Sequence, residues 1–250
     1  MEIKCTQCGA GVPITEDAAF IRCPFCDTAL YVETDRTVTH YYLPASAAVK
    51  DLPLYLQRKL AGFEVKDEVA VKGVTLVFFP YWRFDLATGK SHCLPAAAAP
   101  VEDLHRLKMP AGDLKLFDPP KLEPHRVIEP QVLLVDAALE VKTELANEAA
   151  QFTASSLVHL PLYFVGYACQ GKDFRAVVDA VAGEVYADEW PPGPQREKDR
   201  ALGLIALLAV GLFLFEAALI PGFWLTLAAY AVTALGLYYL ARGVLQRMGW

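Results

Sequence analysis

The chain has 250 residues, of which 54% are hydrophobic, and its formal net charge is −6 at pH 7. This length can bury a sizeable core and can hold one or two domains. The negative charge argues against a general electrostatic attraction to nucleic acid. The apolar residues gather in about the last fifty positions, which argues against a fully soluble chain.

Four of the six cysteines form two CxxC pairs near the N-terminus, Cys5 with Cys8 and Cys23 with Cys26. A CxxC turn places two thiolates on one side of a tight knuckle, and two facing knuckles form a tetrahedral site of four sulfurs. Clustered pairs of this kind are typical of a metal site rather than of a disulfide framework. We therefore predict that these four cysteines hold one metal ion.

The residues around the cysteines favour a closed, structural site within a ribbon over 1–36. Gly9 and Asp27 each follow the second cysteine of a pair, and both residue types tolerate the turn that aims backbone amides at sulfur. Four thiolates leave no open coordination position, so the ion would have a structural role. We predict Zn²⁺, because nothing nearby suggests the electron transfer expected of iron in the same ligand set. A redox role fits two paired CxxC motifs less well.

Charge around the predicted zinc ribbon argues against contact with nucleic acid. Three basic residues stand against six acidic ones, a balance of −3 before the charge of the metal centre is counted. These residues are Lys4, Arg22, Arg36, Glu2, Glu16, Asp17, Asp27, Glu33 and Asp35. Because binding to phosphates depends on cationic side chains, we expect the ribbon to contact protein or to be purely structural.

A short amphipathic helix is predicted after the ribbon. Leu52, Leu56 and Leu60 recur every four residues, so they share one helix face. Pro53 suits the first turn of a helix, and Gly62 is a natural stop.

Aromatic and β-branched residues then predict a β-hairpin. The run VTLVFFPYWRFDLATGK at 74–90 alternates between two faces and ends in a turn. Pro80 cannot donate a ladder hydrogen bond, so we expect it at an edge or a bulge. A further short helix is expected over 101–108, and the five prolines of 110–130 predict an extended, irregular segment.

The second half of the middle region predicts a helix and then a meander. The helix covers about 137–152. Its apolar face would carry Val141, Leu145, Ala149 and Phe152. The stretch LVHLPLYFVGYACQGKDFRAVVDAVAGEVYADEWP, from 157, predicts three strands with turns at QGKD and AG.

Two short motifs suggest an internal repeat. LVFFP at 76–80 and LVHLP at 157–161 are 81 residues apart, and each opens an aromatic strand that runs to a Gly-Lys turn. The chain could therefore contain two copies of a helix-then-hairpin unit. Two similar strands arising by chance are the alternative.

Two long apolar segments near the C-terminus predict a transmembrane helical hairpin over 201–241. Residues 201–220 carry one charge, Glu216, and residues 223–241 carry none. Each segment could cross about 30 Å of hydrocarbon as a helix, and the IPG between them is a tight turn. The alternative, a pair of buried core helices, is rare for such segments in series. Glu216 would lie near the lipid headgroups or contact a partner helix.

Charged residues around the hairpin predict that both chain ends lie in the cytoplasm. Basic residues flank the two apolar segments, and the turn between them has no charge: Arg196, Lys198 and Arg200 precede the hairpin, and Arg242 and Arg247 follow it. The start MEIKCTQC has no apolar run behind a basic stretch, so we expect no cleavable signal peptide and reduced thiols.

No enzyme signature is present in the sequence. His92 and Cys93 are adjacent, so on a strand they would point to opposite faces. GxSxG, HExxH, P-loop and GxGxxG motifs are absent. We therefore predict no catalytic residues and no cofactor-binding residues besides the metal ligands, and the sequence names no small-molecule substrate. The alternative is an enzyme site around Arg83, Asp85 and His92, which a deep polar pocket would favour and a solid aromatic core would exclude.

Taken together, these motifs resemble bacterial membrane-anchored zinc-ribbon proteins. The shared features are an N-terminal Cys₄ ribbon, PYWRF-like strands, a VDA-x-x-G-x-V meander and C-terminal hydrophobic helices. The resemblance implies work with partners of membrane scaffolds or of the envelope-stress response. Some such proteins carry a helicase-related label, but the acidic ribbon and the missing ATPase motif argue against it here.

The sequence thus predicts an α+β protein with five segments. These are a zinc ribbon (1–36), a hairpin-rich middle domain with short helices (37–190), a linker (191–200), a transmembrane hairpin (201–241) and a cytoplasmic tail (242–250). We expect a non-enzymatic adaptor or accessory subunit that contacts the lipid bilayer and a membrane-protein partner in a bacterial inner membrane. The alternatives are a membrane-tethered nucleic-acid or transcription-linked protein, and the enzyme described above.

Overall fold

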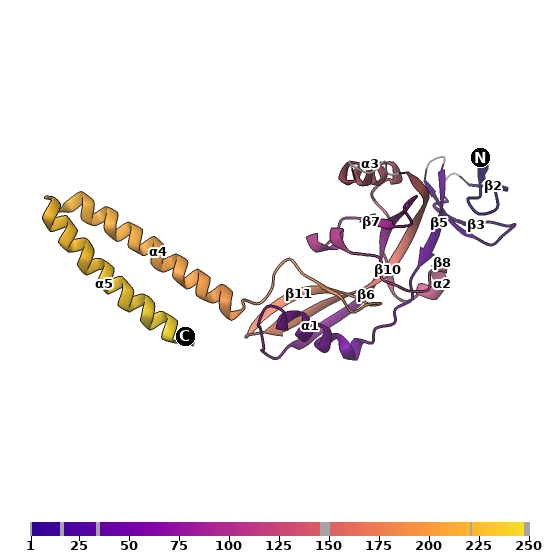
Figure 1. Ribbon diagram of the computed structural model, residues 1–250. Coiled ribbons are helices and arrows are strands. Elements are labelled where there is room, and N and C mark those ends of the chain that lie inside the picture. The colour runs from indigo at the N-terminus through magenta and orange to yellow at the C-terminus, as the bar shows by residue number, and fades with distance from the viewer. Residues whose placement is uncertain (1, 16–17, 34–35, 146–150, 221, 248–250) are drawn as a thin grey trace. The chain divides into compact units, whose positions relative to one another are not determined.

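The computed structural model describes residues 2–15, 18–33, 36–145, 151–220 and 222–247 (Figure 1). The fold is α+β, as predicted, with five α-helices among these residues, a sheet-rich middle, an N-terminal cysteine cluster and two apolar C-terminal helices. The chain forms two compact units, Met1–Lys59 with Asp67–Trp190, and Leu60–Lys66 with Pro191–Trp250. Each unit is described by itself below.

The first unit is built mainly of strands. The described strands are β1 (Glu2–Lys4), β2 (Gly11–Pro13), β3 (Phe20–Arg22), β4 (Ala29–Glu33), β5 (Arg36–Tyr42), β6 (Ala70–Leu86), β7 (Ser91–Pro95), β8 (Lys115–Leu116), β9 (Arg126–Val127), β10 (Phe152–Cys169), β11 (Lys172–Asp179) and β12 (Val185–Tyr186). The helices assigned wholly or mainly to this unit are α1 (Leu52–Ala61), α2 (Pro119–Leu122) and α3 (Leu134–Glu144), with short 3₁₀ turns at Val49–Asp51 and Glu102–Arg106.

One large sheet organises this unit. Its strand order is β12-β11-β10-β5-β4-β3, and the long strand β6 pairs with the other side of β10. Figure 1 shows β6 and β10 running together through the middle of the unit. The strand β5 pairs in parallel with β10, so two segments more than a hundred residues apart in sequence are neighbours.

The register of β6 and β10 relates the two halves of this unit by a local two-fold axis. The two strands are antiparallel, and Phe79 pairs with Leu160 at the 81-residue spacing of the sequence repeat. Each long strand is preceded by a helix and followed by a hairpin partner, β7 or β11. Each also takes a parallel partner from the other half, β9 on β6 and β5 on β10. This arrangement is the one expected of two copies of a helix-then-hairpin unit.

The predicted elements are largely confirmed, and two differences concern the long strands β6 and β10. Pro80 lies inside β6, but on its outer side it falls between Phe78, which pairs with β9, and Tyr81, which pairs with β7. Its missing N–H therefore falls where the outer pairing is interrupted. The helix expected over 137–152 runs instead over Leu134–Glu144, and Phe152 begins β10; residues 146–150 of that prediction lie outside the described residues.

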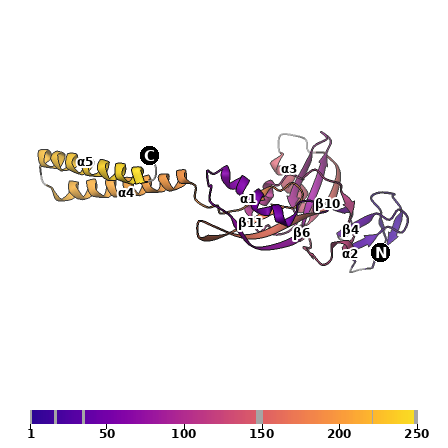
Figure 2. The same cartoon turned by 90° about the horizontal axis from the view of Figure 1, so that it is seen from below.

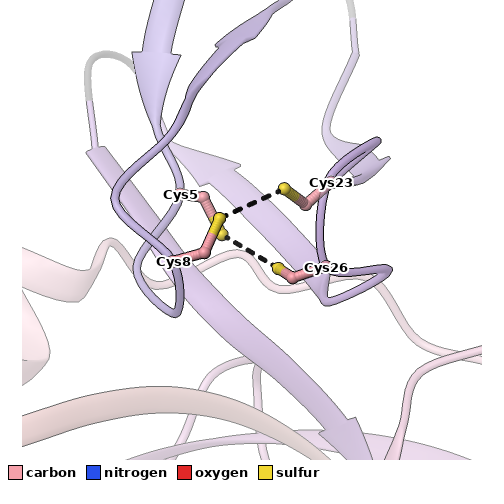
Figure 3. A group of neighbouring side chains, drawn as sticks. All are labelled: Cys5, Cys8, Cys23 and Cys26. Atoms are coloured by element: carbon pink, nitrogen blue, oxygen red, sulfur yellow. Dashed lines mark hydrogen bonds between the residues drawn. The ribbon is translucent and has the colours of Figure 1, made fainter.

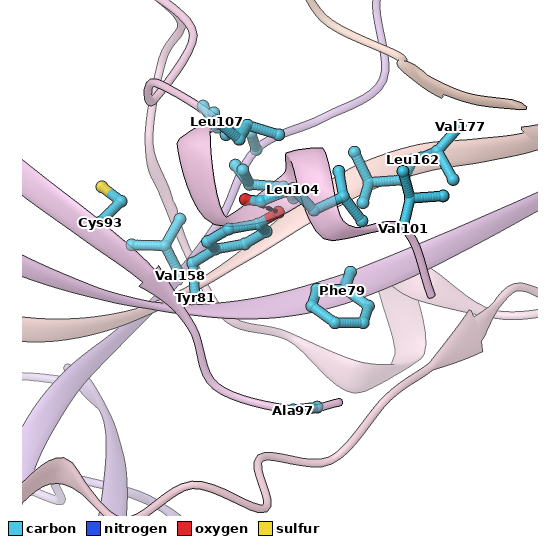
Figure 4. Close-up of a cluster of buried hydrophobic side chains, with 12 residues drawn as sticks. Phe79, Tyr81, Cys93, Ala97, Val101, Leu104, Leu107, Val158, Leu162 and Val177 are labelled. Carbon is cyan, nitrogen blue, oxygen red and sulfur yellow. Dashed lines mark hydrogen bonds between the residues drawn. The ribbon is translucent and has the colours of Figure 1, made fainter. Parts of the chain in front are cut away.

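The two faces of β6 and β10 carry two cores. On one face, Phe79 and Tyr81 pack against Val158 and Leu162 of β10 and against Leu104 (Figure 4). On the other face, three residues of α3 pack against the strands in a second buried cluster. Its buried members are Val38, Trp82, Phe84, Leu94, Ala96, Leu134, Ala137, Val141 and Leu157. Alternation along each strand therefore supplies both cores.

The second unit contains the helical hairpin of α4 (Pro194–Leu219) and α5 (Phe223–Arg247). These helices lie side by side in both views (Figures 1 and 2). Two stretches, Leu202–Leu219 and Phe223–Gly243, are long and apolar enough to cross a membrane, with mean hydropathies of 2.4 and 1.5. The helix α4 begins inside the expected linker, because Pro194 suits the first turn and the charged residues that follow are good helix formers.

A carboxylate faces the inside of this hairpin. Glu216 of α4 accepts a hydrogen bond from the Thr233 hydroxyl of α5, and the Tyr230 hydroxyl donates to the Phe213 carbonyl at 3.2 Å. Glu216 therefore contacts the second helix of its own hairpin.

Candidate metal centre

The two cysteine knuckles have the same backbone design. In the first, the Gly9 amide donates to the Cys5 carbonyl at 2.9 Å. In the second, the Asp27 amide donates to the Cys23 carbonyl at 2.9 Å. Gly9 has φ 75° and Asp27 has φ 58°, so both occupy the left-handed region as predicted. Each turn therefore brings the two thiols of its CxxC pair to one side.

The structure brings all four predicted ligands together. Every Sγ of Cys5, Cys8, Cys23 and Cys26 lies within 4.8 Å of the others. The Cys5–Cys26 and Cys8–Cys23 sulfur distances are both 3.7 Å (Figure 3). Four sulfurs about 2.3 Å from a central tetrahedral ion would be about 3.8 Å apart. The cluster therefore fits a single metal ion, and its sulfurs are too far apart for disulfides.

A threonine that the sequence analysis did not single out completes this centre. The Thr28 hydroxyl lies 3.1 Å from the Cys26 Sγ. Hydrogen bonds from the hydroxyl and the amide of Thr28 lower the pKa of the Cys26 thiol to about 6, which favours the thiolate that a metal needs. A hydroxyl residue directly after a knuckle is too common a feature to have marked this role in the sequence.

The second knuckle belongs to the large sheet rather than to a separate ribbon domain. Cys23 follows β3 and Cys26 precedes β4, and both strands are part of that sheet. The Arg22 guanidinium also reaches Asp118 at 3.4 Å. The first knuckle rests on the same sheet, because the Thr37 hydroxyl donates to the Lys4 carbonyl at 2.8 Å. The ribbon is therefore fixed on the middle region through several contacts.

One large apolar side chain of the second knuckle is exposed. Phe25 lies between Cys23 and Cys26 and is 69% exposed. By contrast, the apolar residues Ile3, Val12 and Leu30 lie in a small core with Cys5 and Cys23. Phe25 is therefore not needed to fill the ribbon core.

The three residues of the alternative enzyme site, Arg83, Asp85 and His92, lie on two different faces of the sheet. Arg83 and Asp85 form an ion pair at 2.8 Å and line a polar groove. His92 pairs in register with Phe84, so it lies on the opposite face, where its Nε2 is 3.0 Å from Glu144. Cys93 packs in the aromatic core, and burial raises the pKa of its thiol to about 11. These residues do not converge on one pocket.

Comparison with models of known protein families, with curated proteins and with solved structures found no match to this chain.

Proposed function

We propose that this protein is a membrane-anchored adaptor or accessory subunit of a bacterial inner-membrane complex, with a structural Zn²⁺ in its ribbon. One observation carries the proposal: a rigid Cys₄ centre with an exposed aromatic residue shares its chain with two helices of membrane-spanning length. The helices would fix the protein at the bilayer, and the ribbon would present a surface to a partner.

The donor set supports zinc as the resident ion. Four thiolates at tetrahedral spacing suit Zn²⁺, and iron is the other ion that binds such a set. All four positions around the ion are taken by Cys5, Cys8, Cys23 and Cys26, so the ion would hold the two knuckles together without reacting.

The partner surface is proposed to centre on Phe25. Exposed aromatic residues on rigid turns are favoured anchors in protein interfaces, because they bury much area and lose little conformational entropy. The metal and the knuckle hydrogen bonds hold the backbone on either side of Phe25. The acidic balance of 1–36 supports a protein partner over a phosphate backbone.

The test is purification of the tagged full-length chain from its own membranes in mild detergent, with co-purifying proteins identified by mass spectrometry. We expect a stoichiometric membrane-protein partner. Phe25→Ser and the Cys5→Ser, Cys8→Ser double variant should both lose it. Leu54→Ser is the matched control, because Leu54 is an exposed apolar residue (52%) on α1, away from the ribbon.

Two results would contradict the proposal. One is a chain that purifies alone with its metal bound. The other is salt-sensitive binding of DNA or RNA that Phe25→Ser or loss of the metal abolishes, which would favour the nucleic-acid alternative. Elemental analysis of the purified chain distinguishes zinc from iron.

A further inference from the structure

A polar groove of about 1120 Å³ lies beside the ribbon in the first unit. Its sheet residues include Thr37 and Thr39 of β5, Ala154 and Ser156 of β10, and the Arg83–Asp85 pair of β6. Residues Glu2, Lys4, Thr6 and Gln7 of the ribbon also line it. The groove is larger than the about 300–1,000 Å³ of typical small-molecule sites, so its size suits a segment of polymer.

Two strand edges open onto this groove. The parallel pairing of β5 with β10 begins at Thr39 and Ser156 and continues only toward the C-terminal ends of these strands. Among the described strands, none pairs with Phe152–Ser155 on the side of β10 away from β6, or with Arg36–Val38 on the side of β5 away from β4. Backbone N–H and C=O groups on an unpaired edge are a template for another strand.

The same edge in the other half of the repeat is built differently. The local two-fold places Gly73 of β6 at the position of Ala154, and Phe164 at the position of Arg83. There the cavity of about 490 Å³ has a mainly apolar lining that includes Pro100, Val101 and Phe164, with Thr75 and Arg175 as its polar members. The groove next to the ribbon has more hydroxyl groups, including those of Thr37, Thr39 and Ser156, and charges of both signs, so it has features beyond those the repeat imposes.

The charges of the groove indicate the character of its occupant. Arg83 is neutralised by Asp85. Within the described part of the chain, neither Lys4 nor Arg36 has an ion-pair partner, and Glu2 is the other unpaired charge in the lining. The groove is therefore net positive on a chain whose total charge is −6, which favours an acidic ligand.

We propose that this groove binds an extended, acidic peptide segment of a partner protein. The segment would pair with the free edge of β10 at Phe152–Ser155 and direct its carboxylates toward Lys4 and Arg36. Four residues of a strand span about 13 Å at about 3.3 Å each, so a short motif suffices. This inference rests on the proposed function, because it names a second place at which the adaptor holds its partner.

The test uses the full-length protein in detergent micelles and a phage-displayed library of random 12-residue peptides. Selected peptides are synthesised with a fluorescent label, and their affinities are measured by anisotropy. We expect peptides rich in Asp and Glu. Methylation of alternate backbone nitrogens in a selected peptide should abolish its binding, because a strand pairs through its N–H groups.

Matched variants locate the binding site. Ala154→Trp fills the groove and should weaken binding by at least about tenfold, the equivalent of about 1.4 kcal/mol. Gly73→Trp is the control at the two-fold position, where an added Cβ meets nothing within 4 Å, and should leave affinity unchanged. Arg36→Glu should also weaken binding and should flatten its salt dependence. Because Arg36 is exposed, Arg36→Glu should fold, and it replaces Ala154→Trp in the test if thermal unfolding shows that Ala154→Trp does not fold.

Each contrary outcome overturns the inference. It fails if the library yields no binders, if the binders lack acidic residues, or if Ala154→Trp and Arg36→Glu bind them as the unchanged protein does. It also fails if a labelled 12-nucleotide oligothymidine binds and is lost in Ala154→Trp, since the groove would then hold nucleic acid. Failure here with a partner still lost in Phe25→Ser leaves the proposed function intact. If the groove binds acidic peptides but the chain purifies from its membranes without a partner protein, the result contradicts the proposed function and not this inference.

Discussion

Asp27 does in the second knuckle what Gly9 does in the first, at a cost that glycine avoids. Its φ of 58° is tolerated by Asp but is a genuine outlier for a β-branched residue. We expect Asp27→Val to destabilise the ribbon by about 1–3 kcal/mol and to lower its metal affinity, measured by competition with a chelator. Asp27→Gly loses the same exposed ion pair with Arg22 but should bind metal at least as tightly. Equal metal affinities of the two variants would contradict this account.

A buried histidine pair connects β5 to β10. The His159 Nε2 donates to the Ile128 carbonyl at 2.8 Å, so its Nδ1 is free to accept from the His40 Nε2, also at 2.8 Å. The His40 ring stacks on Phe117, with ring centres 3.7 Å apart. Burial lowers the pKa of His40 to about 2 and that of His159 to about 4. Both rings are therefore neutral at physiological pH.

The pair predicts a loss of stability in mild acid. Below the ordinary histidine pKa of about 6.5, these two histidines bind protons in the unfolded chain but not in the folded chain. The free energy of unfolding therefore falls as pH falls. Each histidine contributes up to about 1.4 kcal/mol per pH unit, down to pH of about 4 for His159 and beyond for His40.

The measurement compares denaturant unfolding of the first unit between pH 7 and 5 with that of His40→Phe. This variant keeps an aromatic ring against Phe117 but removes one of the two titrating groups. Its free energy of unfolding should fall with a slope reduced by up to half, whatever its stability at pH 7. Equal slopes in the two proteins would show that His40 is accessible to protons in the folded state.

At the scale of elements, local patterns were predictable and the parallel pairing was not. The helix at Leu52–Ala61 follows from its leucine spacing and its Pro and Gly signals, and all three leucines are buried. The four clustered cysteines of the candidate metal centre follow from two short-range motifs. By contrast, the β5–β10 ladder joins segments 117 residues apart in sequence, as in the Thr39–Ser156 pair. The His40–His159 contact and the open groove depend on it, so no local signal marks them.

The misplaced helix end has a similar explanation. A helical period continues from α3 toward Phe152, so the sequence favoured one long helix over 137–152. In the structure Phe152 instead packs with Phe84 and pairs with Leu86 at the start of β10. Tertiary pairing along a strand that is 18 residues long outweighs the weak local preference for helix.

The polar contact inside the helical hairpin is open to a direct test. Thr233→Val keeps the side-chain shape and removes the hydroxyl that donates to Glu216. Hydrogen bonds between transmembrane helices contribute about 0.6 kcal/mol on average and at most about 1.7 kcal/mol, so we expect a destabilisation in this range. It can be measured by denaturing-detergent titration of the purified chain. Thr226→Val is the control, because that hydroxyl donates to the Ile220 and Gly222 carbonyls of the turn and not to a side chain of α4. A Thr233→Val protein as stable as the control would remove any role for this contact.

At the scale of the whole molecule, the metal centre and the groove share one sheet. The strands β3 and β4 carry the second knuckle, and β5 next to them lines the groove with Thr37 and Thr39. The Thr6 and Thr39 hydroxyls lie 3.1 Å apart, so the first knuckle is tied to the same strand. Loss of the metal should therefore disturb the groove wall as well as Phe25. The two helices long and apolar enough to cross a membrane belong to a different unit, so the proposed membrane attachment and the metal centre should be separable by mutation.

The charge pattern around the hairpin predicts the membrane topology. Basic residues lie at the N-terminal end of α4 and at the C-terminal end of α5, and Ile220–Gly222 carries no charge, so both chain ends should stay in the cytoplasm. Alkaline phosphatase is active only outside the cytoplasm. A fusion after Gly222 should therefore be active and a fusion after Trp250 inactive, with a green fluorescent protein fusion after Trp250 as the positive control.

Replacing Arg196, Lys198 and Arg200 with Glu should raise phosphatase activity at Trp250, since orientation follows the Lys and Arg bias. High phosphatase activity of the unaltered chain fused at Trp250 would rule out the proposed topology. It would place the chain's C-terminus, and with two crossings its metal centre, outside the cytoplasm.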